Sequence, residues 1–220
     1  MSDQLLEQSF FSKDPFEVAK NLVGKVLCHK VSGLTLMAKI IETEAYYADE
    51  PGSHSSKGIT PSKEALYMSP GTFYMYYSRG KDSLGFSVGQ PGDGILIKSA
   101  VPYAKADKYD KMLQKMHAFN PINGRKREDH RLCSGQTLLC TALNIKVTDW
   151  NKRQMDKNGL YVVDTGYTPK NPVRCKRLGI PENRNHKALD RVVDLKYIKS
   201  VTKSPLSKGV VEGVDYLYIA

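Results

Sequence analysis

The chain has 220 residues, of which 40% are hydrophobic and 25% charged, a composition typical of a soluble globular protein that excludes a collagen, a disordered tail and a coiled coil. Lys and Arg number 33 against 23 Asp and Glu, and the resulting net charge of +10 is uneven, because residues 1–110 carry 12 basic and 13 acidic side chains and residues 111–220 carry 21 and 10. A basic half beside a neutral half favours a polyanion such as nucleic acid as partner, although a basic protein without such a partner has the same composition.

The first third of the chain predicts a helix, a β-hairpin and a loop. Residues 12–23 have a capping Asp-Pro pair and apolar side chains at helical spacing, so we expect a helix there. The runs 26–31 and 34–47 are rich in strand-forming residues and flank a Ser-Gly turn, which predicts a hairpin. The Pro-, Gly- and Ser-rich run 48–61 indicates a loop.

The middle of the chain predicts short elements in a mixed order. Residues 62–68 and 137–143 indicate short helices, and residues 72–77 and 95–100 have strand composition. Pro102 is expected to open a lysine-rich helix. Because strand pairs are interrupted by helices without regular β–α alternation, we expect a single α+β domain spanning residues 1–220.

The sequence gives no sign of export or of a structural metal. Its acidic start lacks the apolar core of a secretory signal, and no run approaches the roughly 20 apolar residues of a membrane span. No cysteine belongs to a Cys-x-x-Cys pair or to a zinc-like spacing with histidine; the four are Cys28, Cys133, Cys140 and Cys175. We therefore expect a reduced cytoplasmic protein that is not secreted and binds neither membrane nor metal. Cys133 and Cys140, seven residues apart, are expected on one face of a helix as buried apolar residues.

One predicted strand carries two carboxylates. Glu42 and Glu44 alternate along it, so both should point to one face, about 7 Å apart by strand rise. Tyr46 follows on the same face, and such groups are costly in an apolar strand unless they are exposed or used. An edge strand with a solvated polar face is the alternative interpretation.

A second strand is rich in tyrosine. The chain has 13 tyrosines against one tryptophan, and Tyr74 and Tyr76 share one strand face. An aromatic surface near carboxylates in a basic protein suits the stacking of a nucleobase, although aromatic strand residues more commonly belong to the core and its rim. His54 lies in the polar loop. The zinc-deaminase pattern of histidine, glutamate and paired cysteines is absent, which argues against that class of base-modifying enzyme.

Taken in order, these motifs resemble the alkyladenine (3-methyladenine) DNA glycosylase family. The resemblance covers residues 9–145 well and 146–220 loosely. It implies a compact α+β domain with a curved, mainly antiparallel sheet flanked by helices. It also implies a base-excision repair enzyme that hydrolyses the N-glycosidic bond of purines such as 3-methyladenine, hypoxanthine and ethenoadenine. The motifs that carry it are Ile41–Tyr46, His54-Ser55, Pro70–Tyr76, Gly92–Gly94, Lys98 four residues before Pro102, Leu132–Gly135 and Leu139-Cys140.

The resemblance assigns roles to individual residues. Glu44 matches the general base that activates the attacking water, and Lys98 stands where the family usually has an arginine beside that carboxylate. Tyr46, His54 and Tyr76 match the residues that sandwich a flipped base. The implied partner is double-stranded DNA containing damaged purines, bound by a monomer that needs no cofactor. These residue types suit the reaction, because cleavage of a nucleoside bond builds oxocarbenium character that a carboxylate stabilises.

The sequence departs from the family pattern at two further positions. Arg79 stands where the family inserts a tyrosine into the gap left by the flipped nucleotide, and Tyr77 is the second candidate for that wedge. Ser87 falls at or near the asparagine that checks the flipped base. For the DNA backbone we expect contacts from the basic run Arg125, Lys126 and Arg127.

Two other functions remain open at this point. One is a non-catalytic nucleic-acid-binding homologue, which Arg79 and Ser87 favour and Glu44 opposes. The other is a small-molecule nucleosidase or an RNA-directed enzyme. The positive charge of the second half argues against a small uncharged substrate.

Overall fold

The computed structural model describes residues 3–122 and 125–219, and a large antiparallel sheet is its frame. Its strands are β1 (Gln4–Leu5), β2 (Val26–Val31), β3 (Leu34–Tyr46), β4 (Phe73–Ser78), β5 (Lys81–Ser87), β6 (Gly94–Pro102), β7 (Leu160–Asp164), β8 (Pro172–Cys175), β9 (Arg191–Asp194) and β10 (Tyr216–Tyr218). The order is β1-β7-β2-β3-β6-β5-β4, while β9 joins β3 and continues to β8 and β10.

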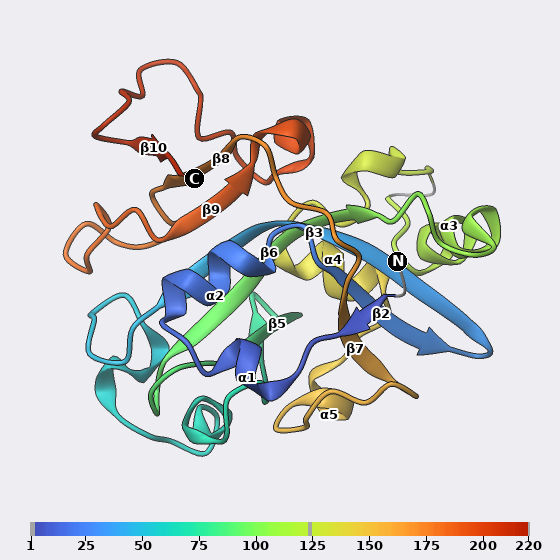
Figure 1. Ribbon diagram of the computed structural model, residues 1–220, viewed down its shortest axis with the longest axis horizontal. Coiled ribbons are helices and arrows are strands. Elements are labelled where there is room, and N and C mark those ends of the chain that lie inside the picture. Colours follow the sequence, from blue (N-terminus) through green and yellow to red (C-terminus); the bar gives the residue numbers. More distant parts are fainter. Residues whose placement is uncertain (1–2, 123–124, 220) are drawn as a thin grey trace.

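Helices cover both faces of this sheet. In Figure 1, α2 crosses the near face of β3 and β6, whereas α4 lies behind them. The α-helices are α1 (Gln8–Phe11), α2 (Pro15–Leu22), α3 (Tyr109–Phe119), α4 (Gln136–Ala142) and α5 (Val147–Trp150). The 3-10 turns are η1 (His54–Lys57), η2 (Glu64–Tyr67), η3 (Asp129–Arg131) and η4 (Leu195–Ser200). This arrangement confirms the expected α+β class.

The helix and hairpin predicted near the N-terminus are both present. Asp14 caps α2 by accepting hydrogen bonds from the amides of Phe16 and Glu17, at 2.9 and 3.3 Å. The hairpin of β2 and β3 turns through Ser32 and Gly33, both of which have positive φ angles. Strand and turn composition therefore predicted this part of the fold correctly.

The long strand β3 has neighbours along both edges. Its first half pairs with β2, its second half pairs with β9, and β6 runs along the opposite edge. Glu42 and Glu44 consequently lie opposite Val193 and Arg191 of β9, and both glutamates are buried. The alternative of a solvated edge strand is wrong, because β9, some 150 residues later in the chain, covers this end of β3.

Two local predictions are also wrong. Pro102 ends β6 instead of opening a helix, and α3 starts only at Tyr109, after Lys108 adopts a positive φ of 57°. A proline is tolerated at the end of a strand, where its missing amide costs no ladder hydrogen bond. Cys133 lies before α4 and not on the same helix as Cys140, although both are buried as expected.

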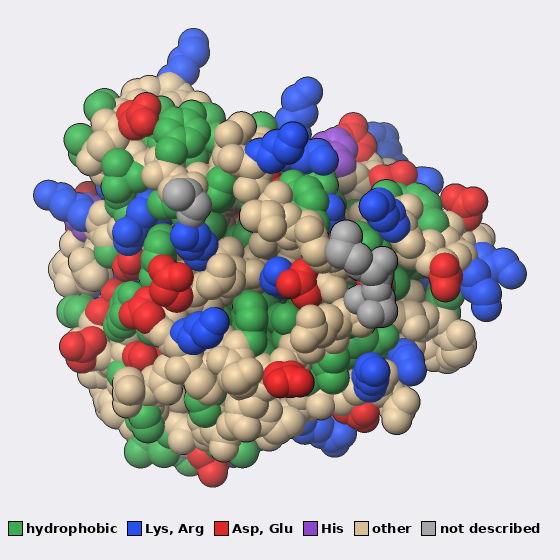
Figure 2. Space-filling view, in the orientation of Figure 1, with side chains coloured by type: hydrophobic (Ala, Val, Ile, Leu, Met, Phe, Trp, Pro, Cys, Tyr) green, Lys and Arg blue, Asp and Glu red, His purple; other side chains and the backbone are tan. Residues whose placement is uncertain are grey.

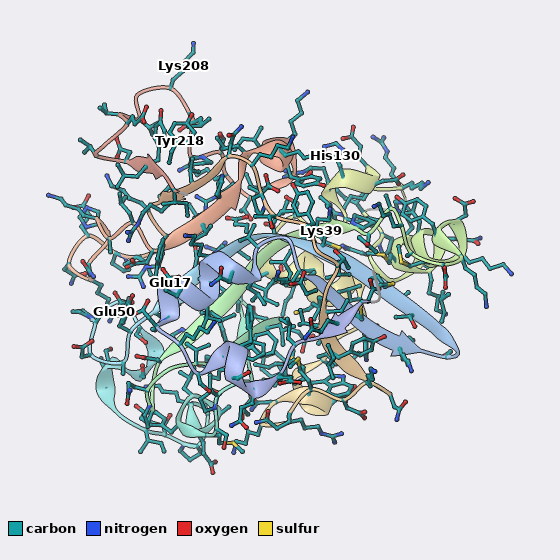
Figure 3. All side chains as sticks on the ribbon, in the orientation of Figure 1. Glu17, Lys39, Glu50, His130, Lys208 and Tyr218 are labelled. Carbon is teal, nitrogen blue, oxygen red and sulfur yellow. The ribbon has the colours of Figure 1, made fainter. Side chains whose placement is uncertain are left out.

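The C-terminal strands form a projecting lobe, seen at the upper left of Figures 1 and 2. Figure 3 labels Lys208 at the tip of a loop there and Tyr218 on β10. Exposed apolar side chains on this lobe include Val211, Val214 and Tyr218. Among helices of the described residues, none has the length and apolar character required to cross a bilayer.

Candidate active site

The buried carboxylate of Glu44 is the centre of the site. Its Oε1 accepts a hydrogen bond from the Leu178 amide at 2.9 Å. Its Oε2 accepts one from the Tyr46 hydroxyl at 2.9 Å and one from the Lys98 ammonium at 3.3 Å. The side chain of Glu44 is 0% exposed, and all three donors line a single cavity. Glu44 therefore lies directly behind the cavity wall with a fixed orientation.

The cavity has a volume of about 790 Å³. It is bounded by the β4–β5 hairpin, the ends of β3 and β6, the start of α4 and the segment from Leu178 to Arg184. Among the described residues that line it, none is Asp or Glu, and the cations are Arg79, Lys81, Lys98 and Arg184. The lining thus combines aromatic rings with positive charge, which suits an anionic ligand that carries a flat ring.

Three aromatic side chains form one wall of the cavity. The rings of Tyr74 and Tyr76 stack with centroids 5.5 Å apart, and His54 meets Tyr76 edge-on at 4.7 Å. His54 Nδ1 lies 2.7 Å from the Tyr74 hydroxyl. Burial, together with the charge of Lys63, lowers the pKa of His54 below its usual 6.5. The imidazole is therefore neutral at pH 7, and the wall is polar but uncharged.

Tyr76 is held by a residue that sequence analysis missed. Gln136, at the start of α4, donates from Nε2 to the Tyr76 hydroxyl at 3.3 Å and to Ser83 Oγ at 3.2 Å. Burial and the nearby charge of Glu44 raise the pKa of Tyr76 to about 12, so the phenol stays protonated. No motif marks Gln136, because α4 lies 60 residues from Tyr76 in the sequence.

Tyr46 faces the same cavity from the end of β3. Burial and the charge of Glu44 raise its pKa well above 10, which keeps the hydroxyl protonated and able to donate to Glu44. The Arg177 guanidinium lies against the ring, 4.6 Å from its centroid. The structure thus brings together five predicted residues at one cavity: Glu44, Tyr46, His54, Tyr76 and Lys98.

Glu42, the other carboxylate of β3, has a different environment. It accepts a 2.7 Å hydrogen bond from Arg191 Nε, and the two side chains are 0% and 2% exposed. Ser99 also donates to it. Glu42 does not line the cavity, so this pair joins β3 to β9 and holds the strand beneath the site.

Ser87 is not at the cavity, contrary to the sequence prediction. It is buried, its hydroxyl donates to the Ser69 carbonyl at 2.8 Å, and it accepts from the Thr72 amide at 3.2 Å. In the β4–β5 hairpin, Tyr74 lies opposite Gly85. Gly85 and Lys81 of β5 line the cavity, whereas Ser87 on the same strand face does not. A Cβ at Gly85 would lie 2.2 Å from the Ile95 carbonyl oxygen, so no side chain fits there.

The two candidate wedge residues differ in position. Arg79 is at the tip of the β4–β5 hairpin, with a positive φ of 51°, and its exposed side chain lines the cavity mouth. Tyr77 follows Tyr76 on the opposite face of β4 and is 58% exposed. Tyr77 does not line the cavity, which makes Arg79 the better placed of the two.

The predicted backbone contacts lie away from the cavity lining. Arg125, Lys126 and Arg127 belong to the loop between α3 and η3, and none of them lines the cavity. The cations that do line its mouth include Arg184, which no sequence motif marks. Within the described parts of the chain, no group of three or more His, Cys, Asp or Glu side chains is arranged to hold a metal ion.

Comparison with known proteins agrees with this geometry. The family model described as methylpurine-DNA glycosylase (MPG) matches residues 9–197. The chain belongs to the methylpurine-DNA glycosylase family. The resemblance inferred from the sequence is thereby confirmed, and the chain is a DNA glycosylase, an enzyme of DNA repair.

Bacterial relatives extend the similarity over nearly the whole chain. A protein of Pseudomonas syringae pv. tomato named "Putative 3-methyladenine DNA glycosylase" is 46% identical over 215 residues, which is 97% of this chain and 96% of the relative. One of Pseudomonas aeruginosa with the same name is 45% identical, over 96% of this chain and 89% of its own length. A Clostridium botulinum relative, again of that name, is 33% identical over 80% of this chain and 87% of its own.

Proposed function

We propose that this glycosylase removes alkylated or deaminated purines, of the 3-methyladenine, hypoxanthine or ethenoadenine type, from double-stranded DNA after flipping them into the cavity. The observation that carries the proposal is the buried Glu44 carboxylate, oriented by three donors behind an aromatic cavity. The cationic lining of that cavity adds to it. A base inside a duplex cannot reach Glu44, so the nucleotide must leave the stack.

The flipped base would be recognised mainly by its ring. Tyr46, Tyr76 and His54 offer flat surfaces on the cavity wall, and stacking contributes about 1–3 kcal/mol per base without demanding one pattern of hydrogen bonds. Gly85 adds no side chain to the wall. This combination suits a set of damaged purines of different shapes. Flipping costs least for a base that is poorly paired, which adds selectivity for damage.

Glu44 would act as the general base. Water loses a proton to the carboxylate and its oxygen bonds to C1′, while the C1′–N bond breaks and its electron pair leaves with the purine. The carboxylate also stabilises the positive charge that develops on the sugar. Lys98, 3.3 Å from Oε2, holds the carboxylate in place. Each of these steps uses only side chains of this chain, water and the DNA.

The cations of the cavity mouth would bind phosphates. Arg79, Lys81 and Arg184 surround the opening through which a flipped nucleotide must pass. Arg79 is also positioned to enter the gap in the duplex. We retain Arg125, Lys126 and Arg127 as a separate backbone contact, on a loop outside the cavity. The enzyme is proposed to act as a monomer, because every group that this mechanism uses comes from one chain.

One experiment tests the proposal against its alternatives. The protein is incubated with duplexes that contain 3-methyladenine, hypoxanthine, ethenoadenine or no lesion, and alkali then cleaves abasic sites. We expect cleavage at the lesions, at a rate that falls steeply with salt when the enzyme is limiting. Binding without cleavage would instead indicate a non-catalytic homologue. Salt-insensitive turnover of free nucleosides would indicate a nucleosidase.

A further inference from the structure

A buried ion pair lies beside the cavity, outside the groups that the proposed chemistry uses. Arg177 donates from both terminal nitrogens to the two carboxylate oxygens of Glu50, the Nη2–Oε2 bond being 2.7 Å long. The two side chains are 1% and 7% exposed. A buried ion pair gives little net stability over apolar residues of the same shape, so its presence here calls for a geometric explanation.

Arg177 is attached to three parts of the site. Its Nη1 also donates to the Ala45 carbonyl at 2.8 Å, one residue after Glu44. Its guanidinium lies 4.6 Å from the centroid of the Tyr46 ring. The next residue along the chain, Leu178, supplies the amide that bonds Glu44 Oε1. The position of Arg177 therefore determines both the tilt of Tyr46 and the orientation of the carboxylate.

Glu50 is bonded to the turn that carries His54. Its carbonyl accepts from the Ser53 amide at 3.0 Å, and Ser53 caps η1, the turn that begins with His54. Its carboxylate also accepts from Asn185 Nδ2 at 3.1 Å. Figure 3 labels Glu50 on the loop after β3, and Figure 1 shows that loop beside the one that joins β8 to β9. The ion pair thus links two loops that both line the cavity.

A glycine marks the closest approach of these loops. A Cβ at Gly52 would lie 3.0 Å from the Arg184 carbonyl oxygen and 3.1 Å from Arg177 Nη2. A methyl group there would push the loop after β3 away from the segment that carries Arg177. Gly52 therefore provides a second way to disturb this junction of the two loops, by steric pressure and without removal of a charge.

We infer that Arg177, held by Glu50, is a positioning residue. It fixes Tyr46 and the His54 loop at the separation that a flipped base needs. Through Leu178 it also fixes Glu44. It is buried and is not among the residues that line the cavity. The inference rests on the proposed function, because the two loops need a defined separation only if a base enters the cavity between them. Small displacements of catalytic groups are costly, since about 1 Å of misplacement can lower a rate about 100-fold.

Four variants of the full-length protein test this inference. R177K keeps the charge but loses the planar fork and the stacking on Tyr46. The double variant E50Q/R177M removes both charges and keeps the packed volume, so that no buried charge is left unpaired. G52A keeps both charged side chains and presses a methyl group against the Arg184 carbonyl and Arg177 Nη2. K176M is the matched control, because Lys176 is the adjacent residue and pairs with Asp215 at 2.5 Å instead.

The readout is the single-turnover rate of hypoxanthine release, measured below the melting temperature of each variant and with enzyme in excess. Binding of an undamaged duplex is measured in parallel. We expect R177K, E50Q/R177M and G52A to lose about 10-fold to 100-fold in rate with undamaged-duplex binding retained, and K176M to match the wild type.

The outcomes distinguish failure of the positioning role of Arg177 from failure of the proposed function. Wild-type rates in folded R177K and E50Q/R177M, with only the melting temperature lowered, would overturn the positioning role and leave the proposed function intact. Failure of the wild-type protein to release any base would overturn the proposed function, and this inference with it.

Discussion

The Leu178 amide donates a 2.9 Å hydrogen bond to Oε1 of Glu44, a residue 134 positions earlier in the chain. This contact brings the loop after β8 to the carboxylate on β3, and it leaves Oε2 to Tyr46 and Lys98. The two oxygens of Glu44 therefore have different partners. A general base requires such a fixed orientation, because it must lie within hydrogen-bond reach of the proton that it removes.

The wedge assignment predicts different results for two neighbouring tip residues. Arg79→Ala should weaken binding of lesion-containing duplex about 10-fold, because Arg79 lines the cavity mouth and can stack or contact phosphate. Tyr77→Ala should have little effect, since Tyr77 is on the other face of β4. Titration of each variant with a hypoxanthine duplex measures this. A larger loss of binding in Tyr77→Ala than in Arg79→Ala would instead assign the wedge role to Tyr77.

The phosphate contacts predict a change in salt dependence. Each of Lys81→Ala and Arg184→Ala should reduce the slope of log affinity against log salt by about 0.9, the value for one lost phosphate contact. Neutralising Arg125, Lys126 and Arg127 together should weaken binding to all sequences and leave bond cleavage in the bound complex unchanged. Fluorescence anisotropy at several salt concentrations tests both statements. An unchanged slope would remove the residue concerned from the DNA interface.

The lowered pKa of His54 predicts a pH effect on lesion choice. The neutral imidazole present at pH 7 becomes cationic only below 6.5, because its pKa lies under that value. A positive charge on this wall would repel a cationic base such as 3-methyladenine more than neutral hypoxanthine. The excision rate of 3-methyladenine divided by that of hypoxanthine should therefore fall as the pH decreases below 6.5 in the wild type. In His54→Gln the ratio should lose this dependence, and an identical profile would contradict the assignment.

The corrected position of Ser87 predicts a structural and not a selective role. Ser87→Ala should lower the free energy of unfolding by about 0.5–1.5 kcal/mol, because it removes the hydroxyl that bonds the Ser69 carbonyl while the Thr72 amide keeps its bond to Ser69, and lesion preference should not change. Gly85→Ala should cost about 1–3 kcal/mol through its clash with the Ile95 carbonyl and should slow excision as well. Chemical denaturation and lesion-competition assays give the two measurements. Altered lesion preference in Ser87→Ala would restore the original prediction.

The sequence predicted the parts of the site that are local in the chain. Alternation placed Glu44 with Tyr46 and Tyr74 with Tyr76, because each pair lies on one strand. Ser87 was assigned from the family resemblance alone, because no strand was predicted over residues 81–87, and it is Gly85 that pairs with Tyr74 in the hairpin.

The remaining parts depend on distant segments. Arg177 meets Glu50 across 127 residues, and Gln136 reaches Tyr76 across 60. Neither contact can be recognised from spacing or composition. The first forms only when β9 joins β3, and the second only when α4 packs on β5. Arg184 was missed for the same reason. The basic second half of the chain thus contributes to the site through Arg177 and Arg184 as well as through its overall charge.

Single-turnover excision by Glu44→Gln tests the account most directly. The amide is nearly isosteric and keeps an oxygen that can accept hydrogen bonds, but it cannot take a proton from water. We expect base release from a hypoxanthine duplex to slow by at least about 100-fold, the lower range for general base catalysis, while binding of that duplex is retained. A wild-type rate of base release by Glu44→Gln would contradict the central claim.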